Sequence, residues 1–181
     1  MFFVVERETF FMEDNIKHLQ NTEAVEKIKE IVEKADTCLF CTNMKTGEPF
    51  STRPMSTQEV DDEGNLWFLS DKENNKNMEL THDDHVQLLY SSSNHAGFLN
   101  VFGKATVLYD KEKIKELWKP LIKTWFQGGE DDPNISVIKV TPEQGYYWDT
   151  RHGKMVAFFK MLASVVSGKT MDDSIEGTIK I

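Results

Sequence analysis

The chain has 181 residues, the usual size of one domain, and 39% of them are hydrophobic, with 12 Phe and 4 Trp, so it can form a large core. Its 21 basic and 30 acidic residues give a net charge of −9, which argues against nucleic acid or an anionic membrane surface as the main partner. No apolar run has the length of a membrane-spanning helix, and the N-terminal stretch MFFVVERETFFMED carries acids where a signal peptide has a basic start. The sequence therefore predicts a cytoplasmic protein.

An arm and a helix are predicted at the start of the chain. The first dozen residues are apolar and aromatic, which is compatible with an added strand or an arm, and residues 1–20 are assigned to an N-terminal arm. From Thr22 to Ala35, apolar residues recur at a three-four spacing with Glu and Lys between them. This pattern is typical of an amphipathic helix on the surface of a domain.

Both cysteines lie in residues 37–42, TCLFCT, which are predicted to form a strand. Cys38 and Cys41 have the spacing of a redox or metal-binding pair. However, the sequence has no second cysteine pair for a structural zinc site, and a redox pair normally opens a helix, which lowers the thiol pKa. We therefore interpret both residues as core cysteines.

Residues 65–80, NLWFLSDKENNKNMEL, change within one position from a buried strand to a polar segment. The apolar run 66–69 follows a turn at 61–64, which indicates a strand leaving a hairpin. After Ser70, the polar residues are predicted to begin a short helix. Backbone N–H groups at a helix start, together with the ammonium of Lys76, are suited to hold a phosphate group.

Arg53 lies on the preceding strand, predicted over residues 50–60. If the turn at 61–64 pairs that strand with residues 66–70, the Arg53 side chain converges on Ser70 and Lys76. The residues also leave simpler interpretations open: an ordinary strand–loop–helix connection with solvated charges, and an exposed cross-strand salt bridge for Arg53.

The second half of the chain is predicted to be mainly strand, over residues 84–92, 98–110, 135–140 and 144–150. Gly103 inside the second of these suggests a bulge or bend of the kind that closes barrels. A helix is predicted over residues 111–125, bent by Pro120, and residues 151–181 form a C-terminal extension with a polar, mobile end. His82 and His85 are interpreted as surface histidines and not as metal ligands, because no third ligand lies near them in the sequence.

Six or seven strands with short links and few helices favour an antiparallel barrel with peripheral helices. The sequence contains no GxGxxG, GxxxxGK[ST] or GxSxG motif. A Rossmann enzyme, a P-loop nucleotide phosphatase and a serine hydrolase are therefore not expected.

Five short motifs, in this order, resemble the pyridoxamine 5'-phosphate oxidase-like split barrels, and most of all the branch of general stress protein 26. They are Arg53-Pro54-Met55, WFLSDKENNKN, VFGKA, WFQGGEDDP and GYYWD. The resemblance implies a single domain over residues 1–181 that is mainly β, with peripheral α-helices. It implies a six-stranded antiparallel split β-barrel of Greek-key type over residues 36–150. It also implies a homodimer with two flavin mononucleotide (FMN) sites at the subunit interface, and a small-molecule substrate.

The same resemblance implies a set of cofactor-binding residues. Arg53, Ser70 and the pair Asn75-Lys76 match the positions that hold the FMN phosphate. The strand around Met55 lines the isoalloxazine ring, and Trp148 matches a tryptophan that the partner subunit supplies. With the aromatic residues that could complete the ring wall, the predicted FMN-binding residues are Arg53, Pro54, Met55, Leu69, Ser70, Asn75, Lys76, Trp125, Phe126 and Trp148.

The chain departs from the family pattern at positions that bear on function. Asn75 stands in place of the arginine of the phosphate-binding pair, and Phe98 stands where a glutamine is expected. The positions that clamp the substrate of the true oxidase are occupied here by Gln58, Lys154 and Val156. We therefore expect no oxidation of pyridoxamine phosphate at ordinary enzyme rates.

Three hypotheses about function remain open from the sequence. The first is an FMN-dependent oxidoreductase that acts on an unknown small molecule, in which the flavin supplies the chemistry and no catalytic side chain is named. The second is a non-catalytic flavin-binding stress protein. The third is a split barrel that has lost flavin and serves as an interaction module or binds a tetrapyrrole or deazaflavin.

Overall fold

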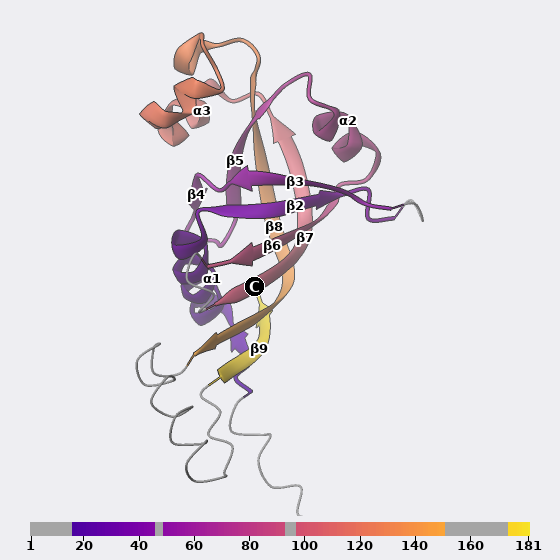
Figure 1. Ribbon diagram of the computed structural model, residues 1–181, viewed down its shortest axis with the longest axis vertical. Coiled ribbons are helices and arrows are strands. Elements are labelled where there is room, and N and C mark those ends of the chain that lie inside the picture. Colours follow the sequence, from indigo (N-terminus) through magenta and orange to yellow (C-terminus); the bar gives the residue numbers. More distant parts are fainter. Residues whose placement is uncertain (1–15, 46–48, 93–96, 151–173) are drawn as a thin grey trace, which may run out of the picture.

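The computed structural model describes residues 16–45, 49–92, 97–150 and 174–181 (Figure 1). These residues form one nine-stranded sheet accompanied by helices. The helices are α1 (Asn21–Ala35), α2 (Asn75–His82), α3 (Lys111–Leu117) and the 3-10 helices η2 (Pro120–Thr124) and η3 (Gly129–Asp131). The strands are β1 (Leu19–Gln20), β2 (Thr37–Thr42), β3 (Ser51–Ser56), β4 (Glu59–Val60), β5 (Leu66–Asp71), β6 (His85–Ser91), β7 (Phe98–Leu108), β8 (Ile135–Thr150) and β9 (Ser174–Lys180).

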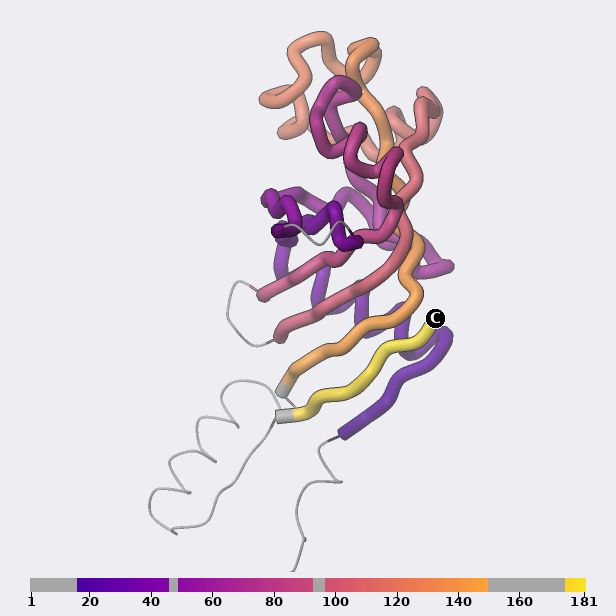
Figure 2. Tube along the Cα trace, turned by 90° about the vertical axis from the view of Figure 1, so that its right-hand side faces the viewer, coloured from indigo at the N-terminus to yellow at the C-terminus, as the bar shows by residue number. Residues whose placement is uncertain are grey.

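The long strand β8 divides the sheet into two parts. Its first half pairs with β5, and its second half, from Gly145, pairs with β9, while β7 runs antiparallel along both halves. Beyond β7 the order continues through β6 and β2 to β3, and these strands lie side by side in one curved layer (Figure 2). The sheet is not closed, and its two parts are those of a split barrel.

The predicted bend in β7 is confirmed. The pairing register of β7 with β8 shifts between Phe102 and Gly103. A Cβ atom at position 103 would collide with the carbonyl oxygen of Thr141, so only glycine allows the two backbones to approach this closely. The bulge lies next to the point at which β5 ends its contact with β8 and β9 begins, so it helps to separate the two parts of the sheet.

The main core lies between α1 and the inner faces of the strands. The predicted amphipathic helix is confirmed: α1 buries Ala24, Val25, Ile28, Ile31 and Val32. Alternate residues of β6 and β7 are buried, as expected for strands with one face on a core, whereas β2 buries Phe40, Cys41 and Thr42 in succession. Cys38 and Cys41 are both buried free thiols, as predicted, and burial raises the pKa of Cys38 to about 12.

A second, smaller apolar cluster joins α3 and η2 to the first half of β8. Its buried members are Ile114, Leu117, Ile122, Phe126, Ile135 and Val137. The predicted continuous helix over residues 111–125 is wrong, because α3 ends at Leu117 and the chain restarts as η2 at Pro120. A residue before proline avoids the helical region, and Lys119 is extended, with φ −125° and ψ 147°.

Three predictions about strands also need correction. Residues 135–140 and 144–150 form one continuous strand, β8, because β7 pairs with both segments. The strand predicted over residues 50–60 breaks after Ser56, and only Glu59 and Val60 pair with β5, so the strand of Arg53 pairs with β2 and not with residues 66–70. In the C-terminal extension, residues 174–180 form β9, which pairs with β8 and β1, whereas the run 155–166 lies outside the described residues.

Candidate functional site

Lys76 is a buried cation at the start of α2. Asn74 caps this helix, because its side chain accepts a hydrogen bond from the backbone N–H of Lys76 at 3.0 Å. The cap turns the Lys76 side chain back toward the end of β5, where its Nζ donates to the hydroxyl of Ser70 and only 3% of the residue is exposed. Burial, together with the nearby Arg53 guanidinium, lowers the pKa of Lys76 to about 8.

Ser70 is held in place by two residues that the sequence reasoning missed. Its hydroxyl donates to Oδ1 of Asn77 at 3.0 Å, and the amide of Asn77 donates to the hydroxyl of Ser136 at 2.8 Å. Ser136 in turn donates to the Ser70 carbonyl oxygen at 3.1 Å. All three side chains are buried, so the network fixes the orientation of the Ser70 oxygen. The polar Asn77 directly after Lys76 was the available signal for this network.

Arg53 reaches the same region from β3, the edge strand of the described sheet. Its Nη2 lies 2.7 Å from Oε2 of Glu79, and its Nη1 donates to the hydroxyl of Thr42 at 3.1 Å. Thr42 also donates to Oε2 of Glu79 at 2.5 Å. Burial by itself raises the pKa of a carboxyl group, but the hydrogen bonds from Thr42 and Arg53 hold the pKa of Glu79 below its ordinary value.

The packing of two sheet parts, and not a hairpin, brings Arg53 near Lys76. Phe40 of β2 and Phe68 of β5 meet edge to face, with ring centroids 5.3 Å apart. This contact holds the β2–β3 layer over β5. Arg53 lies near enough for its charge to help lower the pKa of Lys76, although the pairing predicted to bring the two residues together was wrong.

These donors fit a phosphate group. Within the described part of the chain, Lys76 has no carboxylate at ion-pair distance, and Asp71 and Glu79 attract it only from further away. An ammonium has three N–H donors, and the described residues engage one of them through Ser70. A buried ammonium next to a guanidinium is costly unless an anion joins it, and phosphate oxygens accept from both groups.

The apolar residues predicted to line a flavin ring do not form one surface in a single chain. Met55 shares a face of β3 with Arg53 and packs against the main core, whereas Pro54 is exposed on the other face. Leu69 and Phe126 belong to the second apolar cluster, on the opposite face of β5 from Ser70. Trp125 is 79% exposed.

Two further predicted residues, Trp148 and Asn75, do not take part in the group formed by Arg53, Ser70 and Lys76, which we call the cation cluster. Three strands, β7, β6 and β2, separate the strand of Trp148 from the strand of Arg53. Trp148 is 42% exposed and stacks against Tyr146 with ring centroids 4.6 Å apart. Asn75 is an exposed residue in the first turn of α2. Phe98, the other departure from the family pattern, pairs with Trp148 and is exposed as well.

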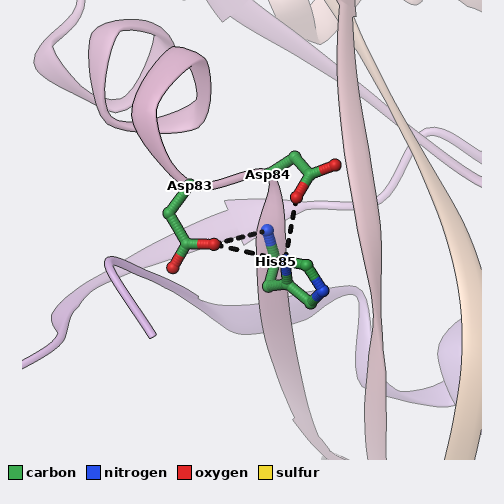
Figure 3. Close-up of side chains that lie close together, drawn as sticks. All are labelled: Asp83, Asp84 and His85. Carbon is green, nitrogen blue, oxygen red and sulfur yellow. Dashed lines mark hydrogen bonds and ion pairs between the residues drawn. The ribbon is translucent and has the colours of Figure 1, made fainter. Parts of the chain in front are cut away.

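One group of side chains within the described ranges has the composition of a metal site. Asp83 and Asp84 directly precede His85, the first residue of β6, and the three side chains lie close together (Figure 3). Both carboxylates lie near the same ring nitrogen, with Nδ1 3.2 Å from Asp83 Oδ1 and 2.8 Å from Asp84 Oδ1. The other ring nitrogen lies 3.2 Å from the ammonium of Lys45. These contacts satisfy the histidine with hydrogen bonds and place a positive charge where a metal would bind.

Two cavities lie away from the cation cluster. One of about 500 Å³ lies between α1 and residues 57–60, and one of about 350 Å³ lies between α1 and the second half of β8. Neither is lined by Arg53, Ser70 or Lys76.

Comparison with known proteins identifies the family. The sequence model described as "Pyridoxamine 5'-phosphate oxidase like" matches residues 23–172. The chain belongs to this family. General stress protein 26 of Bacillus subtilis, a relative, is 29% identical over 81 residues, which cover 43% of this chain and 57% of that protein. The chain spans a little over half the length of the curated relatives it matches.

Solved structures confirm the split-barrel fold of this family. A general stress protein 26 from Jannaschia sp. superposes with a TM-score of 0.74 at 22% identity, over 86% of this chain and 97% of that one. A protein from Xanthomonas citri described as a general stress FMN/FAD binding protein superposes with a TM-score of 0.58 at 25% identity, over 69% of this chain and 87% of that one. Among the helices that the structure describes, none has the length and hydropathy that a membrane span requires.

Proposed function

We propose that this protein binds FMN, with the phosphate held by Arg53, Ser70 and Lys76, and that it is a flavin-dependent oxidoreductase that acts on a small molecule. The observation that carries the proposal is the buried ammonium of Lys76, which lacks a carboxylate partner within the described residues and lies beside a second cation. The description of the Xanthomonas citri relative as FMN/FAD-binding supports a flavin as the ligand.

The flavin ring site is proposed to form between two copies of the chain. Trp148 lies at the opposite end of β8 from Ser136, which contacts Ser70, so it is far along the strand from the Arg53–Lys76 cluster of its own chain. A partner subunit is therefore needed if Trp148 is to cover the ring.

An apolar surface on the outer face of the sheet supports this homodimer. Leu39, Leu89, Phe98 and Trp148 are 38–47% exposed and come from four adjacent strands. Leu39 pairs with Leu89 on β2 and β6, and Phe98 pairs with Trp148 on β7 and β8, so two pairs of large apolar side chains lie on this face. Exposed apolar patches of this kind are typical of protein interfaces.

In the proposed function, the flavin supplies the redox chemistry and the protein side chains bind the cofactor. When bound, FMN supplies the hydride or electron transfer. Arg53 and Lys76 bind the phosphate, and the Ser70–Asn77–Ser136 network fixes the hydroxyl that accepts from the Lys76 ammonium and so positions it. The protein thus anchors one end of the cofactor and leaves the orientation of the ring to the apolar side chains.

An absorbance spectrum of the purified protein, recorded with and without added FMN, tests the binding proposal. We expect a yellow protein, or a preparation that quenches the fluorescence of added FMN at micromolar concentration. A protein that binds no FMN under these conditions contradicts the proposal.

A second measurement separates the enzyme from a non-catalytic flavin-binding protein. The flavin-loaded protein is mixed with NADH or NADPH without oxygen, and the flavin absorbance is followed. Bleaching within seconds supports an oxidoreductase. A flavin that stays oxidised favours a protein that binds flavin without turning it over.

A further inference from the structure

Glu79 places a negative charge inside the proposed phosphate site. It lies on α2 one turn after Lys76, and its Oε2 is 2.7 Å from Nη2 of Arg53. Thr42 donates to the same oxygen at 2.5 Å, and the hydroxyl of Ser51 also bonds to this carboxyl group. The carboxylate is therefore fixed beside the guanidinium by neighbours other than Arg53 itself.

The charges of this cluster do not balance a phosphate monoester. Arg53 and Lys76 contribute two positive charges and Glu79 removes one, so the three groups together carry one positive charge. An FMN phosphate carries close to two negative charges at neutral pH. The position of Asn75, where the family pattern has a further arginine, adds no charge. A bound phosphate must then share Arg53 with a carboxylate that repels it.

We propose that Glu79 is a built-in competitor for the Arg53 guanidinium, which limits the affinity for the phosphate and sets how strongly the protein distinguishes FMN from unphosphorylated riboflavin. This inference rests on the proposed function for the identity of the ligand. In the free protein Glu79 neutralises Arg53, and in the complex the phosphate takes over part of that interaction.

The contacts of Arg53 allow two possible roles of Glu79 to be distinguished: competition with the phosphate, and positioning of the guanidinium. Its Nη1 remains bonded to Thr42 at 3.1 Å, so the guanidinium keeps an anchor when the charge of Glu79 is removed. A purely positioning role predicts that loss of the carboxylate misplaces Arg53 and weakens phosphate binding. Competition predicts instead that loss of the carboxylate strengthens phosphate binding. Riboflavin, which lacks the phosphate, serves as the internal reference.

Glu79→Gln removes the charge and keeps the shape of the side chain. We expect this variant to bind FMN about tenfold more tightly than the wild type, which corresponds to about 1.4 kcal/mol. Binding of riboflavin should stay the same, measured for both ligands by fluorescence quenching at low salt. Glu73→Gln is the matched control, since Glu73 is an exposed acid in the loop before α2 and its removal changes the net charge equally. It should change neither affinity.

Thermal unfolding with inorganic phosphate provides a readout that does not depend on flavin. Phosphate should raise the unfolding midpoint of Glu79→Gln more than that of the wild type or of Glu73→Gln.

If FMN does not bind but this difference in the unfolding midpoint appears, the flavin proposal fails and the role of Glu79 stands. If FMN binds and Glu79→Gln binds it equally or more weakly, the competitor role is overturned while the FMN site stands. If neither FMN nor phosphate distinguishes Glu79→Gln from the wild type, the inference is wrong.

Discussion

Lys76 shows what a single side chain contributes to this site. It is 3% exposed, its ammonium donates to the Ser70 hydroxyl, and the charge of Arg53 helps to lower its pKa, so its own charge is costly in the free protein. Buried charges without a partner are retained where a ligand supplies the missing charge, which is why perturbed lysines mark functional sites. The exposed Lys72, four residues earlier, has no such environment.

Removing the charge of Lys76 should weaken FMN binding without lowering the stability of the folded protein. We expect Lys76→Met to weaken FMN binding by about 1.5–3 kcal/mol, because a charged hydrogen bond to the phosphate is lost. Its unfolding midpoint should not fall, since a buried charge is replaced by an apolar chain of similar length. Calorimetric titration with FMN checks this, with Lys72→Met as the control. Wild-type affinity in Lys76→Met would remove Lys76 from the proposed site.

The lowered pKa of Lys76 predicts a pH dependence of FMN affinity. The pKa is about 8 in the free protein, and a bound phosphate raises it because the anion favours the charged amine. Affinity is therefore full below this pKa and falls as the pH rises through it, because the free protein then lacks the proton that the complex needs. Affinities measured from pH 7 to 9.5 check this. Lys76→Arg, which stays protonated, should not show the decline, and a flat wild-type profile contradicts the assignment.

At the scale of elements, the short helix α2 is the main support of the cation cluster. It carries Lys76, Asn77 and Glu79, and it begins at a cap made by Asn74. Eight residues form few helical hydrogen bonds, so the cap and the packing of the buried residues decide whether the helix forms. In Figure 1, α2 lies at the same end of the molecule as α3, whose N-terminus is capped in the same way by Asp110.

These two caps allow a matched comparison. Asn74→Ala and Asp110→Ala should each lower the free energy of unfolding by about 1 kcal/mol, because each removes one capping hydrogen bond. Only Asn74→Ala should also weaken FMN binding, because α2 carries Lys76 and α3 carries no residue of the proposed site. Denaturant unfolding and FMN titration of both variants test this. Equal FMN affinities in the two variants would show that the order of α2 does not matter to the site.

At the scale of the whole molecule, the sheet separates residues that the proposed site needs together. The cation cluster lies where the β2–β3 layer crosses β5, and Trp148 lies on the second half of β8. The exposed apolar side chains of β2, β6, β7 and β8, which are Leu39, Leu89, Phe98 and Trp148, offer a surface on which a second copy could pack. Assembly and cofactor binding are therefore coupled in this proposal.

This coupling predicts the effect of a charge placed in the apolar surface. Leu89→Glu should shift the protein to a monomer in analytical ultracentrifugation, since a buried unpaired carboxylate is costly at an interface. It should also lose FMN affinity although Arg53 and Lys76 are unchanged. Leu121→Glu, a control in η2 at 79% exposure, should do neither. A monomeric wild type, or a monomeric variant with full affinity, would contradict an interface site.

Much of the fold and part of the site could be predicted from sequence because they depend on local patterns. The three-four spacing of α1, the alternation along β6 and β7 and the glycine in the β7 bulge are each set by residues close together in the chain. The order of the five motifs was enough to recognise the split-barrel family. Arg53, Ser70 and Lys76 were candidates for the same reason, because their chemical types and order were visible.

Only the tertiary structure decided how those residues meet. Arg53 approaches Lys76 through packing of Phe40 on Phe68 and not through a hairpin. Thr42 reaches the guanidinium through the pairing of β2 with β3, and Glu79 reaches it from α2. The separation of Trp148 from this cluster also depends on the strand order. Burial periodicity fixes which face of an element is covered, but it carries no information on which distant element covers it. That choice follows from sheet twist, the Gly103 bulge and core packing, which act on the whole chain at once.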